Sequence, residues 1–180
     1  YTASLLMNSH KNVTIYLGTS GYELVINKDG GGITSPSGTV RYVAGIAPII
    51  HAIDQGSSLF EQWTGDLSPG ANPYGRGLQI LMDQNRSITA IFEEADWYLY
   101  LQVTGNGTTN PAPDVLHWFR DGDPFDVTAT LGADALFLHW QGDVPIGQDP
   151  TSLTISGTMT QNRELIAVFV PTTLTVPDLS

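Results

Sequence analysis

Two short stretches of the sequence, QWTGDL at residues 62–67 and HWQGDV at residues 139–144, determine how the rest is interpreted. In each of them a tryptophan is followed two and three residues later by a Gly-Asp pair. Chance is a weak explanation for meeting this string twice in 180 residues. The pair is therefore either a duplicated structural signature or a duplicated site.

Self-comparison of the sequence extends the duplication well beyond the tryptophans. At an offset of 77 residues, four further features coincide: Met82 with Met159, Asn85-Arg86 with Asn162-Arg163, Phe92 with Phe169, and Gly45 with Gly122. Earlier in the unit the offset is 75, where GGG at 30–32 matches GNG at 105–107. We therefore predict two modules, at residues 21–95 and 96–171.

The two ends of the chain continue the same pattern. LLMNSHKNVTIYL (5–17) is similar to ILMDQNRSITAIF (80–92), which predicts that residues 1–20 are the C-terminal half of a preceding module, a β-hairpin. TTLTV (172–176) is similar to the first strand of a module, so residues 172–180 are expected to be a first-strand stub or a tail. The sequence thus reads as an extended array cut out of register.

Within each module the apolar residues alternate with the period of a β-strand. YELVI (22–26), YLYLQV (98–103) and FDVTATL (125–131) are rich in β-branched and aromatic residues. The glycines of KDGGG (28–32) and TGNGT (104–108) suit tight turns, and we expect each to follow the first strand of a hairpin. One short helical turn is expected near 114–120. The predicted fold is all-β, with tandem small modules that are β-sandwich or β-grasp-like.

A buried tryptophan would stabilise so small a module substantially. It removes ~150–250 Å² from water, which at ~25 cal/mol per Å² contributes roughly 4–6 kcal/mol. We therefore predict that Trp63 and Trp140 belong to the module cores, and that the repeated Gly-Asp pairs form turns in which Asp66 and Asp143 accept backbone N–H bonds. The other predicted core residues are those that recur with the tryptophans: Met82, Met159, Phe92 and Phe169.

These motifs together resemble the bacterial repeat domain related to the internalin B-repeats. The resemblance rests on GGGITSPSG, FEQWTGDL and MDQNRSITAIF in the first module, and on GNGTTNP, FLHWQGDV and MTQNRELIAVF in the second. The second module departs from it mildly, with PAPD where the family prefers Pro-x-Gly. The resemblance implies tandem modules of large exported proteins that act as spacers, stalks or adhesive segments, and it brings no catalytic residue.

Charge and composition exclude several classes of function. The net charge is −11 with only seven basic residues, which argues against nucleic-acid binding. Cysteine is absent, which excludes disulfides and thiolate metal sites. No run of 18 apolar residues occurs, so no membrane span is expected. Sequons at Asn12, Asn85 and Asn106 suit an exported glycoprotein, and the expected location is extracellular or at the cell surface.

The search for reactive groups predicts neither an enzyme nor a cofactor. The four histidines, His10, His51, His117 and His139, have none of the spacings of zinc sites. RDGDPFD (120–126) places Asp121, Asp123 and Asp126 around a glycine, as calcium loops do, but the closing glutamate is missing. The equivalent VAGIAPI (43–49) has no carboxylate, which favours a solvated turn.

Two functions follow as hypotheses. The first is a non-catalytic extracellular structural repeat, as a stalk, filament subunit or adhesin segment, whose partners are neighbouring modules or identical subunits joined head to tail by β-strand complementation. The second is a carbohydrate- or surface-binding module. Trp97 and Trp118 lack tryptophan counterparts in the first module: if exposed they would stack on sugar rings, and if buried at a junction they would join modules.

Overall fold

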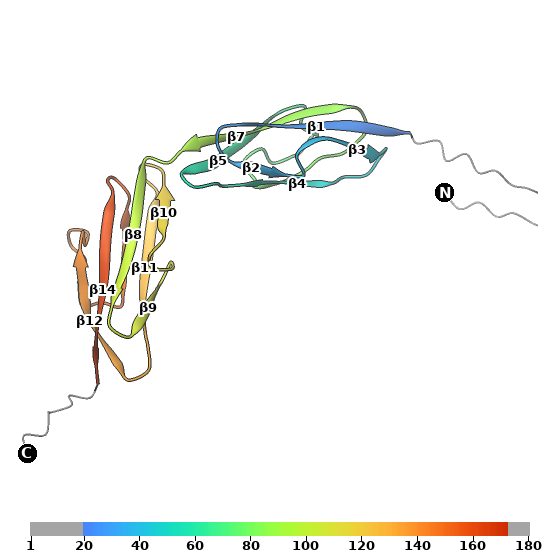
Figure 1. Cartoon of the computed structure of the whole chain (residues 1–180). Coiled ribbons are helices and arrows are strands. Elements are labelled where there is room, and N and C mark those ends of the chain that lie inside the picture. Colours follow the sequence, from blue (N-terminus) through green and yellow to red (C-terminus); the bar gives the residue numbers. More distant parts are fainter. Residues whose placement is uncertain (1–19, 173–180) are drawn as a thin grey trace, which may run out of the picture.

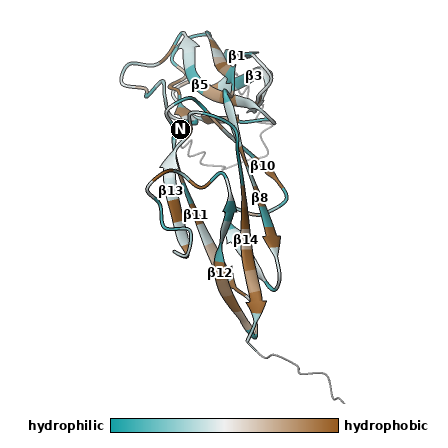
Figure 2. Cartoon of the chain, turned by 90° about the vertical axis from the view of Figure 1, so that its left-hand side faces the viewer, coloured by the Kyte–Doolittle hydropathy of each residue, from teal (hydrophilic) through white to brown (hydrophobic). Residues whose placement is uncertain are grey.

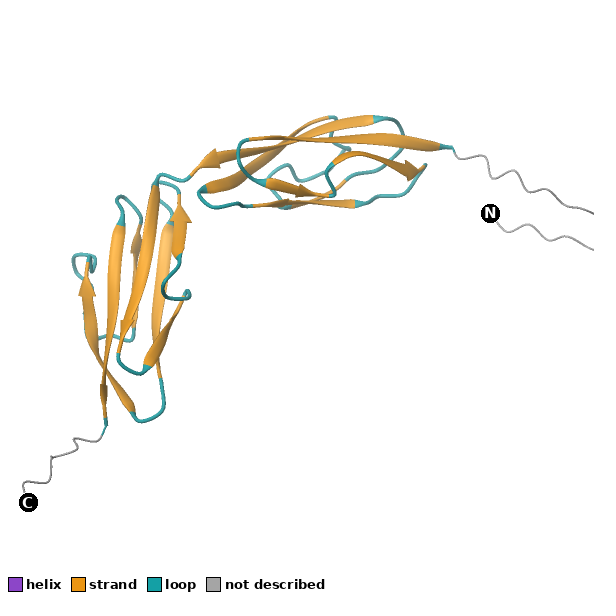
Figure 3. Cartoon of the chain, in the orientation of Figure 1, coloured by secondary structure: helices purple, strands orange, loops and turns teal. Residues whose placement is uncertain are grey.

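The computed structural model describes residues 20–172, and all of the regular structure within them is β-strand (Figure 3). The all-β prediction is confirmed. Two modules follow one another end to end along the chain (Figure 1). The sequence at 1–19 and 173–180 lies outside the described residues, and with it the predicted half module and nearly all of the predicted stub.

The first module contains two β-sheets. Its strands are β1 (Gly21–Asp29), β2 (Ile33–Ser35), β3 (Gly38–Val43), β4 (Ile49–Ile53), β5 (Ser58–Gly65), β6 (Gly77–Gln79) and β7 (Arg86–Glu94). One sheet has the order β3-β1-β7-β5 and the other β2-β4-β6. In the larger sheet the first and last strands, β1 and β7, are parallel neighbours, while the outer pairs are antiparallel.

The second module repeats this topology strand for strand. Its strands are β8 (Trp97–Thr104), β9 (Gly107–Asn110), β10 (Leu116–Phe119), β11 (Pro124–Leu131), β12 (Ala135–Gly142), β13 (Thr154–Thr158) and β14 (Arg163–Pro171). The sheets have the orders β10-β8-β14-β12 and β13-β11-β9. A bulge interrupts β5 after Phe60 and β12 after Phe137, so even the irregularities are duplicated.

Each pair of sheets packs face to face around one apolar core, which makes each module a β-sandwich. Leu24 and Ile88 from the larger sheet meet Ile50 and Leu78 from the smaller one in the first module. The second module has a separate core of the same kind. Such a sandwich buries apolar residues on the facing sides of two sheets, as the period of two in the sequence requires.

The glycine-rich turns do not form the expected hairpins. β1 and β2 lie in different sheets, so the segment after β1 turns a corner between the layers. Glycine is required here for close packing against the last strand: a Cβ on Gly32 would lie 2.1 Å from the Phe92 ring, and one on Gly107 would lie 2.4 Å from the Phe169 ring. Only glycine lets the chain cross the sandwich edge so near to a buried phenylalanine.

The helical turn expected near 114–120 is also wrong. Residues 116–119 form β10, which pairs with β8 at the edge of the larger sheet. Asp114, in the preceding loop, has a positive φ of 60° and donates its N–H to Leu101 O. Pairing with an existing strand satisfies the backbone of this short segment, which local sequence preference alone does not reveal.

Candidate functional site

The two tryptophans of the repeated string lie in the module cores. Trp63 is 1% exposed and Trp140 is 2% exposed. Each indole Nε1 donates a hydrogen bond of 3.0 Å to a carbonyl of the loop after its strand, Gly75 O for Trp63 and Ser152 O for Trp140. The indole therefore fills the core and fixes the long loop between the sheets at once, since its one polar atom has a partner.

The Gly-Asp pair links the end of β5 to the start of β7. Asp66 N donates to Ser87 O at 2.8 Å, and the Asp66 carboxylate accepts from Ser87 N at 3.1 Å. Asp66 thus accepts a backbone N–H, but from the neighbouring strand and not from its own turn. A Cβ on Gly65 would lie 2.4 Å from Ser87 O, so glycine is required there. Asp143 and Glu164 make the same two bonds in the second module, at 2.8 and 3.0 Å.

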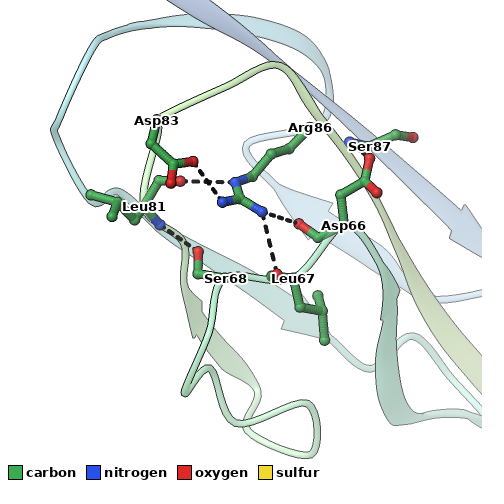
Figure 4. A network of polar contacts seen from close by, with 7 residues as sticks. All are labelled: Asp66, Leu67, Ser68, Leu81, Asp83, Arg86 and Ser87. Carbon is green, nitrogen blue, oxygen red and sulfur yellow. Dashed lines mark hydrogen bonds and ion pairs between the residues drawn. The ribbon is translucent and has the colours of Figure 1, made fainter.

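A buried arginine completes this end of the first module (Figure 4). Arg86, 6% exposed, donates from Nε to Leu81 O at 2.9 Å and from Nη1 to Asp66 O at 3.0 Å. Nη1 also reaches Leu67 O, and Nη2 forms an ion pair of 2.6 Å with Asp83. Sequence reasoning matched Arg86 with Arg163 but assigned neither a role. The signal was present, because an arginine follows Gln-Asn in both modules.

The equivalent arginine of the second module is less well satisfied. Arg163 keeps the bond to a turn carbonyl, Asp143 O, at 3.0 Å. Its Nε is buried without a hydrogen-bond partner, and Thr160 occupies the position of the acidic Asp83. The guanidinium instead lies 5.7 Å from the centre of the Phe125 ring. The two modules therefore share a scaffold but differ in how they neutralise this charge.

The remaining core candidates are all buried: Met82, Met159, Phe92 and Phe169. Met82 and Met159 also accept backbone hydrogen bonds of 2.7 and 2.8 Å from Gly45 and Gly122, the glycine pair found in the self-comparison. The asparagine that comes directly before the repeated arginine, Asn85 in the first module, accepts a hydrogen bond from Glu23 N at 2.9 Å. The repeated polar turn thus ties the last strand of a module to the first.

Two of the three sequon asparagines are in the described part of the chain. Asn85 and Asn106 are both exposed. The Asn106 side chain donates to Ala133 O at 2.6 Å. Asn12 lies outside the described residues, as does His10.

The aspartates of RDGDPFD belong to the scaffold of the second module. Asp121 accepts from Trp97 Nε1 at 2.8 Å, and Asp123 accepts from Arg120 N at 2.9 Å. Asp126 lies within β11 and pairs with Ser156. Within residues 20–172 no three His, Asp or Glu side chains come together in a way that could hold a metal ion.

The histidines are dispersed in the same way. His51 stands in an apolar run of the sequence, yet its side chain is exposed on β4. His117 contacts Ala112 O at 2.7 Å, and His139 contacts Gln141 at 3.0 Å. Neither contact places a second acid or base beside the ring.

Trp97 and Trp118 differ from each other in environment. Trp97 packs against the second core beside the module junction, and its Nε1 is bound to Asp121. Trp118 lies on the edge strand β10, half-buried, with its ring edge-on to Tyr98 at 6.1 Å between centroids. One tryptophan is therefore structural at the junction end of its module, and the other lies on the surface.

The connection between the modules is two residues long, and both residues are hydrogen-bonded. Ala95 N donates to Ser57 O in the first module, and Asp96 N donates to Phe119 O in the second. Arg120 of the second module reaches back with Nη2 to Phe60 O at 3.1 Å and to Leu59 O at 3.3 Å. Two tied residues and one arginine thus connect the sandwiches.

Charges of both modules meet at this connection. Partial desolvation raises the pKa of Glu61, and the neighbouring carboxylate of Glu93 raises it further, whereas Arg120 opposes the rise. Burial raises the pKa of Asp54, but hydrogen bonds from Arg76 and Phe60 N outweigh this rise, and the charge of Arg120 adds a smaller lowering. Arg120 therefore links the second module to acidic groups of the first electrostatically as well as through hydrogen bonds.

Fold and site together define the class: a duplicated β-sandwich module whose repeated residues serve the scaffold. Residues 22–96, which comprise nearly all of the first module, match the family model of the divergent InlB B-repeat domain. The match confirms the resemblance read from the sequence motifs for the first module. No curated protein and no solved structure is detectably similar to the chain. Among the described residues there is no helix able to cross a membrane.

Proposed function

We propose that the chain is a non-catalytic structural segment of a bacterial surface protein, in which consecutive sandwich modules act as a spacer. The family of the first module fits a bacterial surface repeat protein. The observation that carries the proposal is the tied junction: Ala95 is bound to one module and the next residue, Asp96, to the other. A flexible tether would leave such backbone groups to water. We further propose that the second module is a divergent copy of the first, because the two strand orders are the same.

Arg120 is the residue that would keep such a spacer stiff. Its two bonds to Phe60 O and Leu59 O cross from the second module to the first, and both accept charge-assisted hydrogen bonds. Its positive charge also lies near the acidic residues Asp54 and Glu61 of the first module. The relative orientation of the modules is then fixed by contacts and not by linker length alone.

A distance measurement between the modules tests this stiffness. With one spin label on an exposed residue of each module, pulsed electron resonance should give a narrow distribution for the parent protein and a broad one for Arg120→Ala. Arg41→Ala is the matched control, since Arg41 is an exposed arginine far along the first module. A parent distribution as broad as that of Arg120→Ala would contradict the spacer.

Location and assembly need separate tests. Antibodies against the purified chain should label intact cells of the source bacterium, and external protease should remove the label. Labelling only after lysis would contradict a surface role.

The sequence at 1–17 and 172–176 predicts head-to-tail assembly by strand complementation, and nearly all of these residues lie outside the described part of the chain. Negative-stain microscopy of the native material checks it, with filaments expected and isolated globules contradicting assembly.

A further inference from the structure

The outer face of the larger sheet in the second module carries a cluster of aromatic side chains. Leu99 and Leu101 of β8 are buried in the core, so Tyr98 and Tyr100 point to the opposite face of the sheet. The neighbouring strand β10 pairs Trp118 directly with Tyr98, and Leu116 with Tyr100. We call these four residues, Tyr98, Tyr100, Leu116 and Trp118, the aromatic face.

The same positions of the first module show that the fold does not require this cluster. There β1 pairs with β3 so that Glu23 lies opposite Arg41, at 4.0 Å between charged atoms, where the second module has Tyr98 and Trp118. Val25 and Thr39 take the places of Tyr100 and Leu116. A charged, solvated face has thus been replaced by an aromatic one on the same backbone, and core packing gives no reason for it.

Trp118 is also the tryptophan whose polar atom the fold leaves open. The indole N–H groups of Trp63, Trp97 and Trp140 all donate to acceptors within the protein. Trp118 Nε1 has no acceptor among residues 20–172. The atom is not buried, so it faces solvent. An amphipathic ring with an open donor is suited to a ligand that is apolar on one side and polar on the other.

Hydrogen-bonding side chains lie beside the aromatic face. On β14, which runs parallel to β8, Glu164 lies next to Tyr100 and Ile166 lies next to Gln102. The residues that face outward alternate along each strand, so the Glu164 carboxylate and the Gln102 amide lie on the same side of the sheet as the rings. No lysine or arginine occupies these outward positions of β8, β10 and β14, all of which are described strands. Figure 2 shows the mixed hydropathy of these strands.

We propose that the aromatic face binds an uncharged polysaccharide. Sugar rings present apolar C–H faces that stack on Trp118 and the tyrosines, while their hydroxyl groups bond to Glu164, Gln102 and the open indole N–H. The carboxylate and the chain's net charge of −11 disfavour polyanionic glycans. With strands about 4.8 Å apart and outward residues about 6.8 Å apart along each strand, the face covers on the order of 100 Å². A stable protein partner needs about 800 Å², which argues for the smaller ligand.

This binding goes beyond the spacer role and does not depend on it. The test uses the whole chain on a printed array of soluble polysaccharides, comprising β-glucans, mannans, xylans and, as polyanions, alginate and pectin. Affinity electrophoresis in the same polysaccharides then gives dissociation constants. The parent protein should bind at least one uncharged polysaccharide and neither polyanion.

The first module supplies the matched variant. Tyr98→Glu with Trp118→Arg installs the ion pair that the same sheet position already carries in the first module. This variant should keep the parent unfolding temperature and lose affinity by about tenfold or more. Tyr100→Val, again the residue of the first module, provides a second measurement if the double variant fails to fold.

Three results would overturn the proposal. They are no retardation of the parent protein by any uncharged polysaccharide, binding that survives in folded variants, and binding to alginate or pectin that matches the uncharged polymers. A concentration-dependent dimer seen by light scattering and abolished by the same variants would assign the face to self-association instead. None of these outcomes bears on the inter-module distances that test the spacer.

Discussion

Replacing Arg86 by methionine should lower the stability of the first module far more than the same change at Arg163 lowers that of the second. Methionine keeps most of the apolar stem of the side chain, so the change removes chiefly the charged group. Arg86 donates to Leu81 O, Asp66 O and Leu67 O and forms an ion pair with Asp83. Hydrogen bonds to charged groups contribute ~1.5–3 kcal/mol each, and losing a buried partner costs ~3–5 kcal/mol. Because Asp83 is half exposed, we expect a loss of about 3–4 kcal/mol.

Arg163 provides the internal comparison at the equivalent position. It donates to a single carbonyl, Asp143 O, and its Nε is buried without a partner. Removing that unpaired group offsets part of the lost bond, so Arg163→Met should cost about 1 kcal/mol or less. The two variants change the same residue type in the same topological place. The difference of about 2 kcal/mol or more is therefore a measure of the network drawn in Figure 4.

Native-state hydrogen exchange in increasing urea assigns each loss to its module. Amides of β7, such as Ile88, report the first module, and amides of β14, such as Leu165, report the second. Equal losses for the two variants, or a larger loss for Arg163→Met, would refute the reasoning. Exchange in the unaltered module of each variant should match that of the parent protein.

Three further outcomes follow from the same contacts. Trp63→Ala should destabilise the first module by ~3–5 kcal/mol and Trp140→Ala the second by as much, each leaving the other module at its parent midpoint in the urea experiment. Gly107→Ala brings a methyl group to 2.4 Å from a buried phenylalanine ring and should cost ~1–3 kcal/mol of second-module stability in the same assay. Burial raises the pKa of Asp54, but hydrogen bonds with Arg76 and Phe60 N outweigh this and leave the pKa below its ordinary 3.8. A carboxyl with a lowered folded pKa stabilises above its unfolded pKa, so first-module stability should fall as the pH drops below about 4, and Asp54→Asn should flatten that part of the stability–pH curve.

The repeat and the strand content were readable from the sequence because both are local patterns. A period of two apolar residues belongs to a strand whatever it later pairs with, and self-similarity needs no structure at all. The burial of both tryptophans was expected for the same reason: a large apolar ring once per small module is most stable in the core, and the rings of Trp63 and Trp140 are found there.

The predictions of hairpins and of a helical turn were wrong because these segments pair with strands that their local sequence does not specify. β1 lies beside β7, which is parallel to it and comes at the far end of the module, and β2 joins the other sheet. Gly32 was predicted to be a turn residue. Glycine is required there because the ring of Phe92, sixty residues away in the sequence, packs against it. Local propensity carries no information on which distant ring approaches the backbone.

The sequence by itself determined that this protein is a duplicated all-β chain with indole-centred cores, since composition, periodicity and self-similarity fix the elements and their apolar faces. Only the tertiary structure decided what the polar residues of the motif do. Asp66 and Arg86 bind backbone groups of other strands, and Tyr98 and Trp118 share a face because β8 and β10 pair in one register. Hydrogen bonds to main-chain atoms and cross-strand neighbours depend on register, and a shift of one residue would move every side chain to the other face.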